Sequence, residues 1–128
     1  MGPLCPPQLN KATLGDAQWH NLQLTDAFVP DGDGAVNQYC KDQFGCVTVR
    51  LQCKTVAEEG TSSEPAVTVL PAGFRPGNSR QLTYLFKDGA STQIGYLYFY
   101  PGGRLVAGRL IGTTGIKIIN CEISYFAD

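Results

Sequence analysis

Hydrophobic and polar side chains alternate most regularly over residues 45–54. One face of this segment is apolar and carries Val47, Val49, Leu51 and Cys53, and the other is polar and carries Thr48, Arg50 and Gln52. A period of two predicts a β-strand with one buried face. The same alternation returns over residues 117–126, whose apolar face carries Ile119, Cys121, Ile123 and Tyr125. We therefore expect two half-buried strands.

Shorter alternating or β-branched segments follow one another along the rest of the chain. They predict strands over residues 19–24, 35–41, 66–70, 80–87, 92–100 and 104–111. Gly, Pro and Asp mark turns between them, and a polar, flexible loop is expected over residues 58–65. About eight short strands without an amphipathic helix predict an all-β fold, either a small antiparallel Greek-key β-barrel or a jelly-roll-like sandwich.

Residues 70–76, Leu-Pro-Ala-Gly-Phe-Arg-Pro, predict a corner between two strands. Pro71 and Pro76 lack the N–H that a sheet ladder needs, so strand pairing should stop between them. Gly73 suits a turn that requires positive φ. We expect Phe74 to fold back over the end of the core and Arg75 to stay near the surface.

Two predicted strands have little polar character on either face. Tyr96, Tyr98 and Tyr100 share one face of residues 92–100, the other face is apolar, and residues 104–111 are apolar on both sides. A strand in an isolated sandwich usually has one polar face. The second face is therefore covered by another subunit or a ligand, or the strand is internal and its tyrosine hydroxyls reach solvent at its edge.

Composition limits the classes of partner. The chain has 128 residues, 43% of them hydrophobic, which fits one domain with its own core. A formal net charge of -1 gives no reason to expect nucleic acid, and no stretch approaches the roughly 20 apolar residues of a membrane span, so we expect no membrane insertion. Residues 1–18 begin with a Pro-rich stretch without a basic flank, which we interpret as a linker rather than a secretory signal.

The five cysteines are Cys5, Cys40, Cys46, Cys53 and Cys121. An odd number without a signal peptide favours free, mostly buried thiols. Cys40 and Cys46 flank a predicted turn, so a cross-strand disulfide between them is the second possibility. We expect no zinc site, because the chain has no C-x-x-C pair and a single histidine, His20.

The chain offers few groups for catalysis. A cysteine nucleophile would need His20 within hydrogen-bond reach, and a lone histidine in a strand is more often structural or exposed. Glu58 and Glu59 fall in the predicted flexible loop, and residues 31–34, Asp-Gly-Asp-Gly, lack the further ligands of a calcium loop. We therefore expect no enzyme and no cofactor.

The side chains near several predicted turns suit a carbohydrate site instead. Sugars present apolar C–H faces for stacking and hydroxyls for paired hydrogen bonds. Aromatic, charged or amide side chains lie at or near these turns: Asn78, Arg80, Tyr84, Asp88 and Arg104. Any one of them could equally be a solvated loop residue.

The order of elements resembles a known family. A tryptophan-led strand (residues 19–24), a Gly-led apolar strand (residues 45–54), the corner at residues 70–76, a hairpin around residues 101–103 and a terminal Ile-Ser-Tyr-Phe (residues 123–126) follow one another. This order resembles the C-terminal head domain of receptor-binding proteins in siphophages that infect Gram-positive bacteria. The resemblance covers the chain from about residue 19 onwards.

The resemblance implies an adhesion function. It implies that residues 19–128 form a β-barrel head that assembles as a homotrimer, and that residues 1–18 are a linker or the end of a stalk. A head of this kind binds host cell-envelope polysaccharide at the distal tail, in a tail fibre or baseplate tip, and reaches other tail or baseplate proteins through an N-terminal region. Some such heads hold sugar with late-strand histidine, aspartate and tryptophan. Here His20 and Trp19 come early, so no site transfers residue by residue.

We therefore take the saccharide site from the residues themselves and predict five contributors: Tyr84, Asp88, Tyr98, Arg104 and Arg109. Two other functions stay open. One is a structural or trimerisation module of a virion fibre without a ligand, and the other is a stand-alone carbohydrate-binding module or degraded hydrolase domain. A tumour-necrosis-factor-like trimeric jelly roll is a weaker alternative, because no signal sequence or secreted disulfide set is visible.

Overall fold

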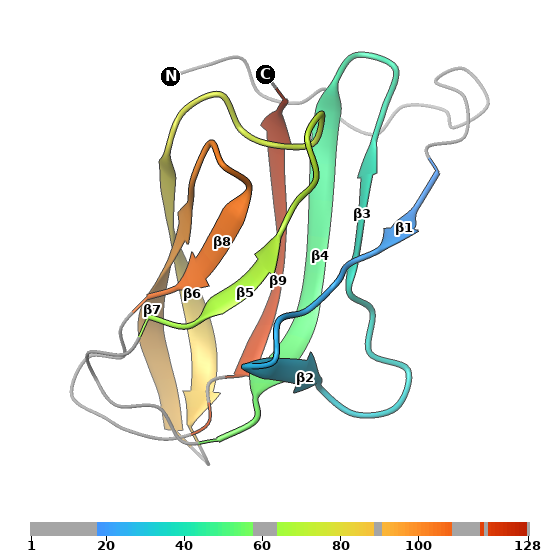
Figure 1. Ribbon diagram of the computed structural model, residues 1–128. Coiled ribbons are helices and arrows are strands. Elements are labelled where there is room, and N and C mark those ends of the chain that lie inside the picture. Colours follow the sequence, from blue (N-terminus) through green and yellow to red (C-terminus); the bar gives the residue numbers. More distant parts are fainter. Residues whose placement is uncertain (1–17, 58–63, 89–90, 109–115, 117, 128) are drawn as a thin grey trace.

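The structure is a computed structural model that describes residues 18–57, 64–88, 91–108, 116 and 118–127. The described residues form strands and no helix, so none of them belongs to a helix that could span a membrane. The strands are β1 (His20–Asn21), β2 (Phe28–Pro30), β3 (Gln38–Lys41), β4 (Cys46–Thr55), β5 (Ala66–Val69), β6 (Arg80–Asp88), β7 (Ser91–Phe99), β8 (Arg104–Ala107) and β9 (Ile118–Phe126) (Figure 1).

The strands join in the order β1-β3-β4-β9-β6-β7-β8-β5, with β2 paired to β4, and every pairing is antiparallel. The whole of β9 pairs with residues 46–54 of β4, and β6 and β7 pair along their whole length. By contrast, β9 and β6 meet only at Phe86↔Ile119 and Lys87↔Ile118. The sheet therefore has a first half, β1 to β4 with β9, and a second half, β5 to β8, joined by a short seam (Figure 1).

The two ends of the strand order are also connected. Residues 23–25, which we call the strap, follow β1 and lie along β5. Leu24 forms a bridge to Thr68, the Thr25 N–H donates to the Val67 carbonyl at 3.0 Å, and the Thr68 hydroxyl donates to the Gln23 carbonyl at 2.6 Å. The strap closes the curved sheet, so the predicted all-β antiparallel barrel or sandwich is confirmed.

The core fills the space between the two halves. Its buried apolar side chains come from both halves and from the segments that join their strands: Leu22, Phe28, Val47, Val49, Leu51, Cys53, Val67, Leu70, Leu97, Phe99, Leu105, Ala107, Ile119, Ile123 and Tyr125. Phe99 and Tyr125 meet edge to face, with ring centroids 4.9 Å apart. Burying one such large apolar side chain stabilises the fold by about 1.5–3 kcal/mol. The alternating apolar side chains of β4 and β9 therefore help to hold the two halves together.

Some sequence expectations need correction. β1 covers only His20–Asn21, because the chain then leaves the ladder with β3 and becomes the strap. β2 was not expected, since it is short and ends in a proline. Cys46 takes part in a disulfide bond, whereas Cys40, Cys53 and Cys121 are free thiols. The disulfide between Cys40 and Cys46 therefore does not form, and the expectation of a free thiol is wrong for Cys46.

The corner at residues 70–76 forms as expected. Gly73 has φ of 91°, and Phe74 packs against the core, where the Tyr125 hydroxyl donates to its carbonyl at 2.5 Å. Arg75 is half-buried, and its Nε donates to the Leu70 carbonyl at 2.8 Å. The corner is thus braced from within, and it brings the end of β5 beside the β7–β8 hairpin.

Candidate functional site

The outer side of β7 carries aromatic side chains. Leu97 and Phe99 point into the core with at most 1% of their surface exposed, while Tyr96 and Tyr98 are half-exposed and Tyr100, just after the strand, is 36% exposed. The rings of Tyr96 and Tyr98 lie 6.3 Å apart between centroids. We call these three residues the tyrosine face; the described part of the chain leaves it partly open to solvent.

A tight hairpin fixes the end of this face. The Gly103 N–H donates to the Tyr100 carbonyl at 2.8 Å, and the Tyr100 N–H donates to the Arg104 carbonyl at 3.0 Å. Gly103 has φ of 92°, and a Cβ there would also lie 2.7 Å from the Arg75 Nε. The Leu70 N–H donates to the Gly103 carbonyl at 2.8 Å. The hairpin tip is therefore tied to the corner, and Arg104 starts β8 at a fixed position.

Gly108, directly after β8, lies against the Tyr98 ring. A Cβ on Gly108 would lie 2.7 Å from Tyr98 Cε2 and 2.6 Å from the Tyr96 carbonyl oxygen, so only glycine leaves room for the ring. Val106, the register partner of Tyr98, is buried beside it. Close backbone approach thus holds Tyr98 against β8.

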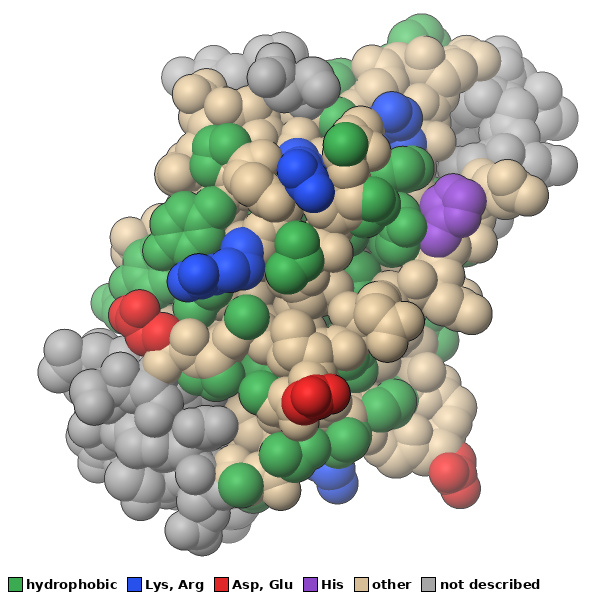
Figure 2. Space-filling view, in the orientation of Figure 1, with side chains coloured by type: hydrophobic (Ala, Val, Ile, Leu, Met, Phe, Trp, Pro, Cys, Tyr) green, Lys and Arg blue, Asp and Glu red, His purple; other side chains and the backbone are tan. Residues whose placement is uncertain are grey.

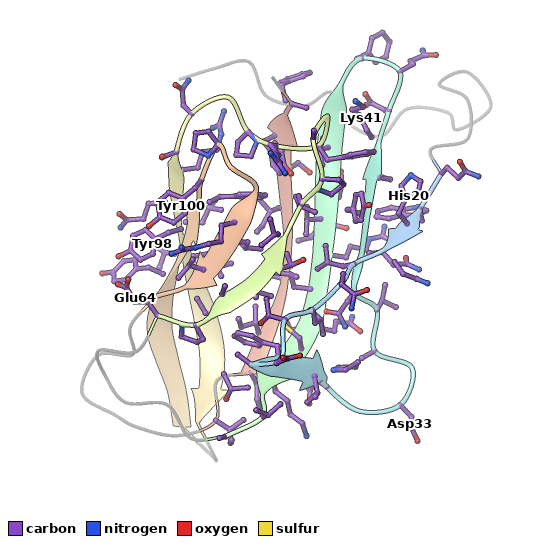
Figure 3. All side chains as sticks on the ribbon, in the orientation of Figure 1. His20, Asp33, Lys41, Glu64, Tyr98 and Tyr100 are labelled. Atoms are coloured by element: carbon purple, nitrogen blue, oxygen red, sulfur yellow. The ribbon has the colours of Figure 1, made fainter. Side chains whose placement is uncertain are left out.

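A hollow of about 420 Å³ lies beside this face, lined by Val69, Tyr100, Gly102 and Arg104. The Arg104 guanidinium carbon lies 5.6 Å from the Tyr100 ring centroid, a cation–π arrangement. Val69 is 53% exposed, and Gly102 has open space where a Cβ would lie. Figure 2 shows hydrophobic and basic side chains together on the side of the molecule where Figure 3 labels Tyr98 and Tyr100.

The polar groups of this region have no partners within the described chain. Neither the Tyr98 and Tyr100 hydroxyls nor the Arg104 guanidinium makes a hydrogen bond or ion pair with a described residue. Glu64 is exposed at the start of the segment that leads into β5, and Figure 3 draws it near Tyr98. The surface therefore offers aromatic faces, free hydroxyls, one cation and one carboxylate, a set that suits a saccharide.

The structure brings together two of the five predicted contributors. Tyr98 and Arg104 lie on the same outer surface of β7 and β8. Tyr84 pairs with Gly95 and Asp88 with Ser91 in the β6–β7 ladder, which places their backbones on the same hairpin; their side chains lie outside the described ones. Arg109 lies outside the described residues.

Sequence reasoning left three lining residues out of the site. Tyr100 is two residues after Tyr98, so the alternation could have found it. Val69 belongs to β5 and reaches the hollow only because β5 pairs with β8. Gly102 was assigned to the turn alone, because no pattern in the neighbouring residues indicates that it lines a hollow.

The outer face of the first half is built differently. Arg50 lies over the Trp19 ring, 4.1 Å from its centroid, and its Nε donates to Glu122 Oε1 at 2.6 Å. The Thr48 and Ser124 hydroxyls are 3.2 Å apart. Here the polar groups satisfy one another within the chain.

A third group of aromatic side chains lies at the corner. Phe74 meets Tyr39 edge to face at 4.9 Å and His20 at 5.7 Å, and the Lys41 Nζ lies 4.9 Å from the Phe74 ring centroid. The Lys41 ammonium also donates to the Gly73 carbonyl at 2.8 Å. These contacts pack His20, Tyr39 and Lys41 around Phe74 at the corner.

Ionisable groups in the interior are kept neutral. Burial raises the pKa of the Cys53 thiol to about 12, with Cys121 and Asp31 adding to the shift, and burial raises the pKa of Cys121 to about 11. Burial also raises the pKa of the Tyr125 phenol. No group of three His, Cys, Asp or Glu side chains able to hold a metal ion occurs among the described residues.

Comparison with known proteins gives an informative similarity among solved structures. The sequence matches no protein-family model and no curated protein. Among solved structures, the fold is similar to the head domain of phage bIL170, one of the receptor-binding domains of lactococcal phages. The TM-score is 0.69, the identity is 16%, and the alignment covers 88% of this chain and 100% of that one. The structural similarity to a phage receptor-binding head, expected from the order of elements, is confirmed; at this identity it establishes the fold.

Proposed function

We propose that this chain is the receptor-binding head domain of a phage tail protein and that it recognises a saccharide of the host cell envelope. The observation that carries the proposal is the fold: the chain matches the whole of a phage head domain described as receptor-binding. The tyrosine face, whose hydroxyls have no hydrogen-bond partner among the described residues, supports it, since adhesion needs a complementary surface and no transition-state chemistry. In this proposal the domain is not an enzyme and acts at the distal tail of the virion.

The binding surface in this proposal is the tyrosine face with Arg104. Tyr98 and Tyr100 offer rings for stacking on sugar C–H faces and hydroxyls for hydrogen bonds. Tyr84, Asp88 and Arg109 are proposed to contribute from the neighbouring β6–β7 hairpin and from the chain after β8. Residues 19–128 would form the head, and residues 1–18 the linker or stalk end that leads to other tail or baseplate proteins.

We further propose that the head works as a homotrimer. Three identical sites gain avidity against a repetitive cell surface, so modest affinity at each site is enough. Light scattering on the purified domain measures this directly. A stable trimer is the expected result, whereas a clean monomer would remove the avidity argument and favour a stand-alone binding module.

The test of the function is binding of the labelled domain to a glycan array and to envelopes of Gram-positive bacteria. We expect binding by the wild type and a clear loss in Tyr98→Ala and Arg104→Ala, with Arg50→Ala on the opposite outer face as the matched control. Tyr84→Ala, Asp88→Ala and Arg109→Ala test the remaining contributors. Wild-type binding in all five variants would remove this surface from the proposal.

One other function has a specific observation in its favour. The tyrosine face is apolar enough to be covered by a second copy, and the chain lacks the late-strand histidine and tryptophan with which some related heads hold sugar. A structural or trimerisation module without a ligand would use the face in this way. Such a module forms trimers but binds no envelope extract, which separates it from the adhesin in the same two experiments.

A further inference from the structure

The hollow beside the hairpin tip differs from the rest of the surface in its charge. Arg104 is exposed and, within the described residues, has no carboxylate partner; the one ion pair there joins Arg50 to Glu122 on the other half. An exposed guanidinium stacked on Tyr100 presents its N–H donors in a planar fork that matches the oxygens of a carboxylate or phosphate. The hollow of about 420 Å³ gives such a group room beside the guanidinium.

Two further cations follow the same edge of the molecule. The Arg75 Nε donates to the Leu70 carbonyl, and the Lys41 Nζ donates to the Gly73 carbonyl, each at 2.8 Å. Both partners are neutral carbonyls of the corner, so neither charge is cancelled by a described carboxylate. Figure 2 shows basic side chains with hydrophobic ones between them on this face. The corner and the hollow therefore carry a local excess of positive charge, although the chain has a net charge of -1.

The one described carboxylate near the tyrosine face is at its other end. Glu64 precedes Pro65, whose carbonyl accepts from the Ala107 N–H at 2.9 Å, next to the glycine on which the Tyr98 ring rests. Arg104, stacked on Tyr100, puts a positive charge at one end of the face, and Glu64 puts a negative charge beyond Tyr98 at the other end, as the labels of Glu64, Tyr98 and Tyr100 show in Figure 3. A ligand with one acidic group would bind in a single orientation on such a surface.

We propose that the hollow lined by Val69, Tyr100, Gly102 and Arg104 is an anion subsite, which takes a carboxylate or phosphate group of an acidic saccharide while the neutral sugar rings lie over Tyr98 towards Glu64. This inference rests on the proposed saccharide-binding function and adds the charge and the direction of the ligand.

The experiment compares three probes on the complete chain by NMR titration and calorimetry. They are a glucuronate-containing hyaluronan oligosaccharide, a phosphate-bearing mannan oligosaccharide and a neutral dextran oligosaccharide of similar length. We expect one or both acidic probes to shift the Gly102 amide and the Arg104 Nε–H signals, with affinity that falls as salt rises, and the neutral probe to bind more weakly. The acidic probe that binds more tightly identifies carboxylate or phosphate as the preferred group.

Matched variants sharpen the result. We expect Arg104→Gln to weaken binding of the acidic probe by about tenfold or more and Arg104→Lys to restore part of it, because lysine keeps the charge and loses the fork. Arg50→Gln removes the same charge from the other half and should leave binding unchanged. Glu64→Gln should keep or improve the affinity, by about twofold, since it removes a repulsive charge at the far end.

Each outcome separates the subsite from the function on which it rests. If envelope saccharide binds wild type and Arg104→Gln equally, or the neutral probe binds as tightly as the acidic ones, the anion subsite is wrong while the adhesion function stands. The absence of Gly102 and Arg104 shifts with either acidic probe at millimolar concentration also overturns the subsite. If acidic probes bind at the hollow but no envelope preparation does, the subsite stands and the proposed function fails.

Discussion

The outer faces of β4 and β7 differ in whether their polar groups have partners among the described residues. β4 buries one face in the core and leaves the other half-exposed, and β7 does the same over residues 95–99, the part of it whose side chains are described. On β4 the polar groups find partners within the chain: Arg50 with Glu122 and Trp19, and Gln52, whose side-chain oxygen accepts from the Val36 N–H at 2.8 Å. On β7 the tyrosine hydroxyls have none among the described residues.

The difference separates a face that serves the fold from one that is available for a partner. A surface whose polar groups are already paired within the chain gains little binding free energy from new hydrogen bonds to a ligand. A surface of aromatic rings and an arginine without an ion pair among the described residues keeps its capacity to bind a partner, because tyrosine and arginine are enriched among the residues that dominate binding energy at protein interfaces. The comparison therefore assigns a role in stability to the outer face of the first half, and the proposed function assigns recognition to that of the second half.

The largest expected difference in stability is between variants of two neighbours on β7, Phe99, which points into the core, and Tyr98, which points outward. Phe99→Ala should lower the free energy of unfolding by about 3–5 kcal/mol, because it leaves a cavity next to Tyr125 in the shared core. Tyr98→Ala should cost about 1 kcal/mol or less while abolishing saccharide binding. Urea denaturation gives both values. Equal destabilisation by the two variants would show that the tyrosine face is part of the core.

The second-largest expected effect is a loss of stability at alkaline pH, caused by the buried Cys53 and the partly buried Cys121 of the first half. Folding raises the pKa of Cys53 from 9.0 to about 12 and that of Cys121 from 9.0 to about 11, so the neutral thiol is favoured in the folded state. The stabilisation is therefore fully present below about pH 9 and is lost as pH rises towards the folded values. We expect a loss of roughly 1–2 kcal/mol between about pH 9 and 10.

Urea denaturation at several pH values measures this loss. The double variant Cys53→Ala, Cys121→Ala removes both thiols and should show a shallower dependence on pH, although it is less stable at neutral pH. An unchanged slope in the double variant would assign the alkaline loss to other groups.

The smallest effect concerns the exposed ion pair of the first half. Arg50→Gln should lower the free energy of unfolding by about 0.2–1 kcal/mol, and the loss should shrink at high salt, because both side chains are partly exposed. Arg104→Gln removes the same charge from the second half, where no ion pair with a described residue exists, and should not change stability. A double-mutant cycle with Glu122→Gln isolates the pair. A larger loss for Arg104→Gln than for Arg50→Gln would reverse the division between the halves.

Local pattern was enough to predict the fold and part of the site. The period of two in β4 and β9, the turn glycines and the proline-bounded corner are properties of neighbouring residues, and each of them was found. What the sequence did not predict depends on pairing between distant strands. The strap, the approach of Val69 to Arg104, and the stacking of Trp19 under Arg50 exist only once β5, β8 and β4 are in place.

The strap also has a consequence for the order of folding. Its hydroxyl contact joins Gln23 to Thr68 over 45 residues, and the pair on the β4–β9 ladder joins Arg50 to Glu122 over 72, whereas β6 and β7 belong to one hairpin. Closing long loops costs entropy before the contacts repay it, so the hairpin should form early and the strap should dock last. A domain with such distant pairings is expected to fold in milliseconds to seconds, and a newly made chain would expose the edge of β5 until residues 23–25 have docked.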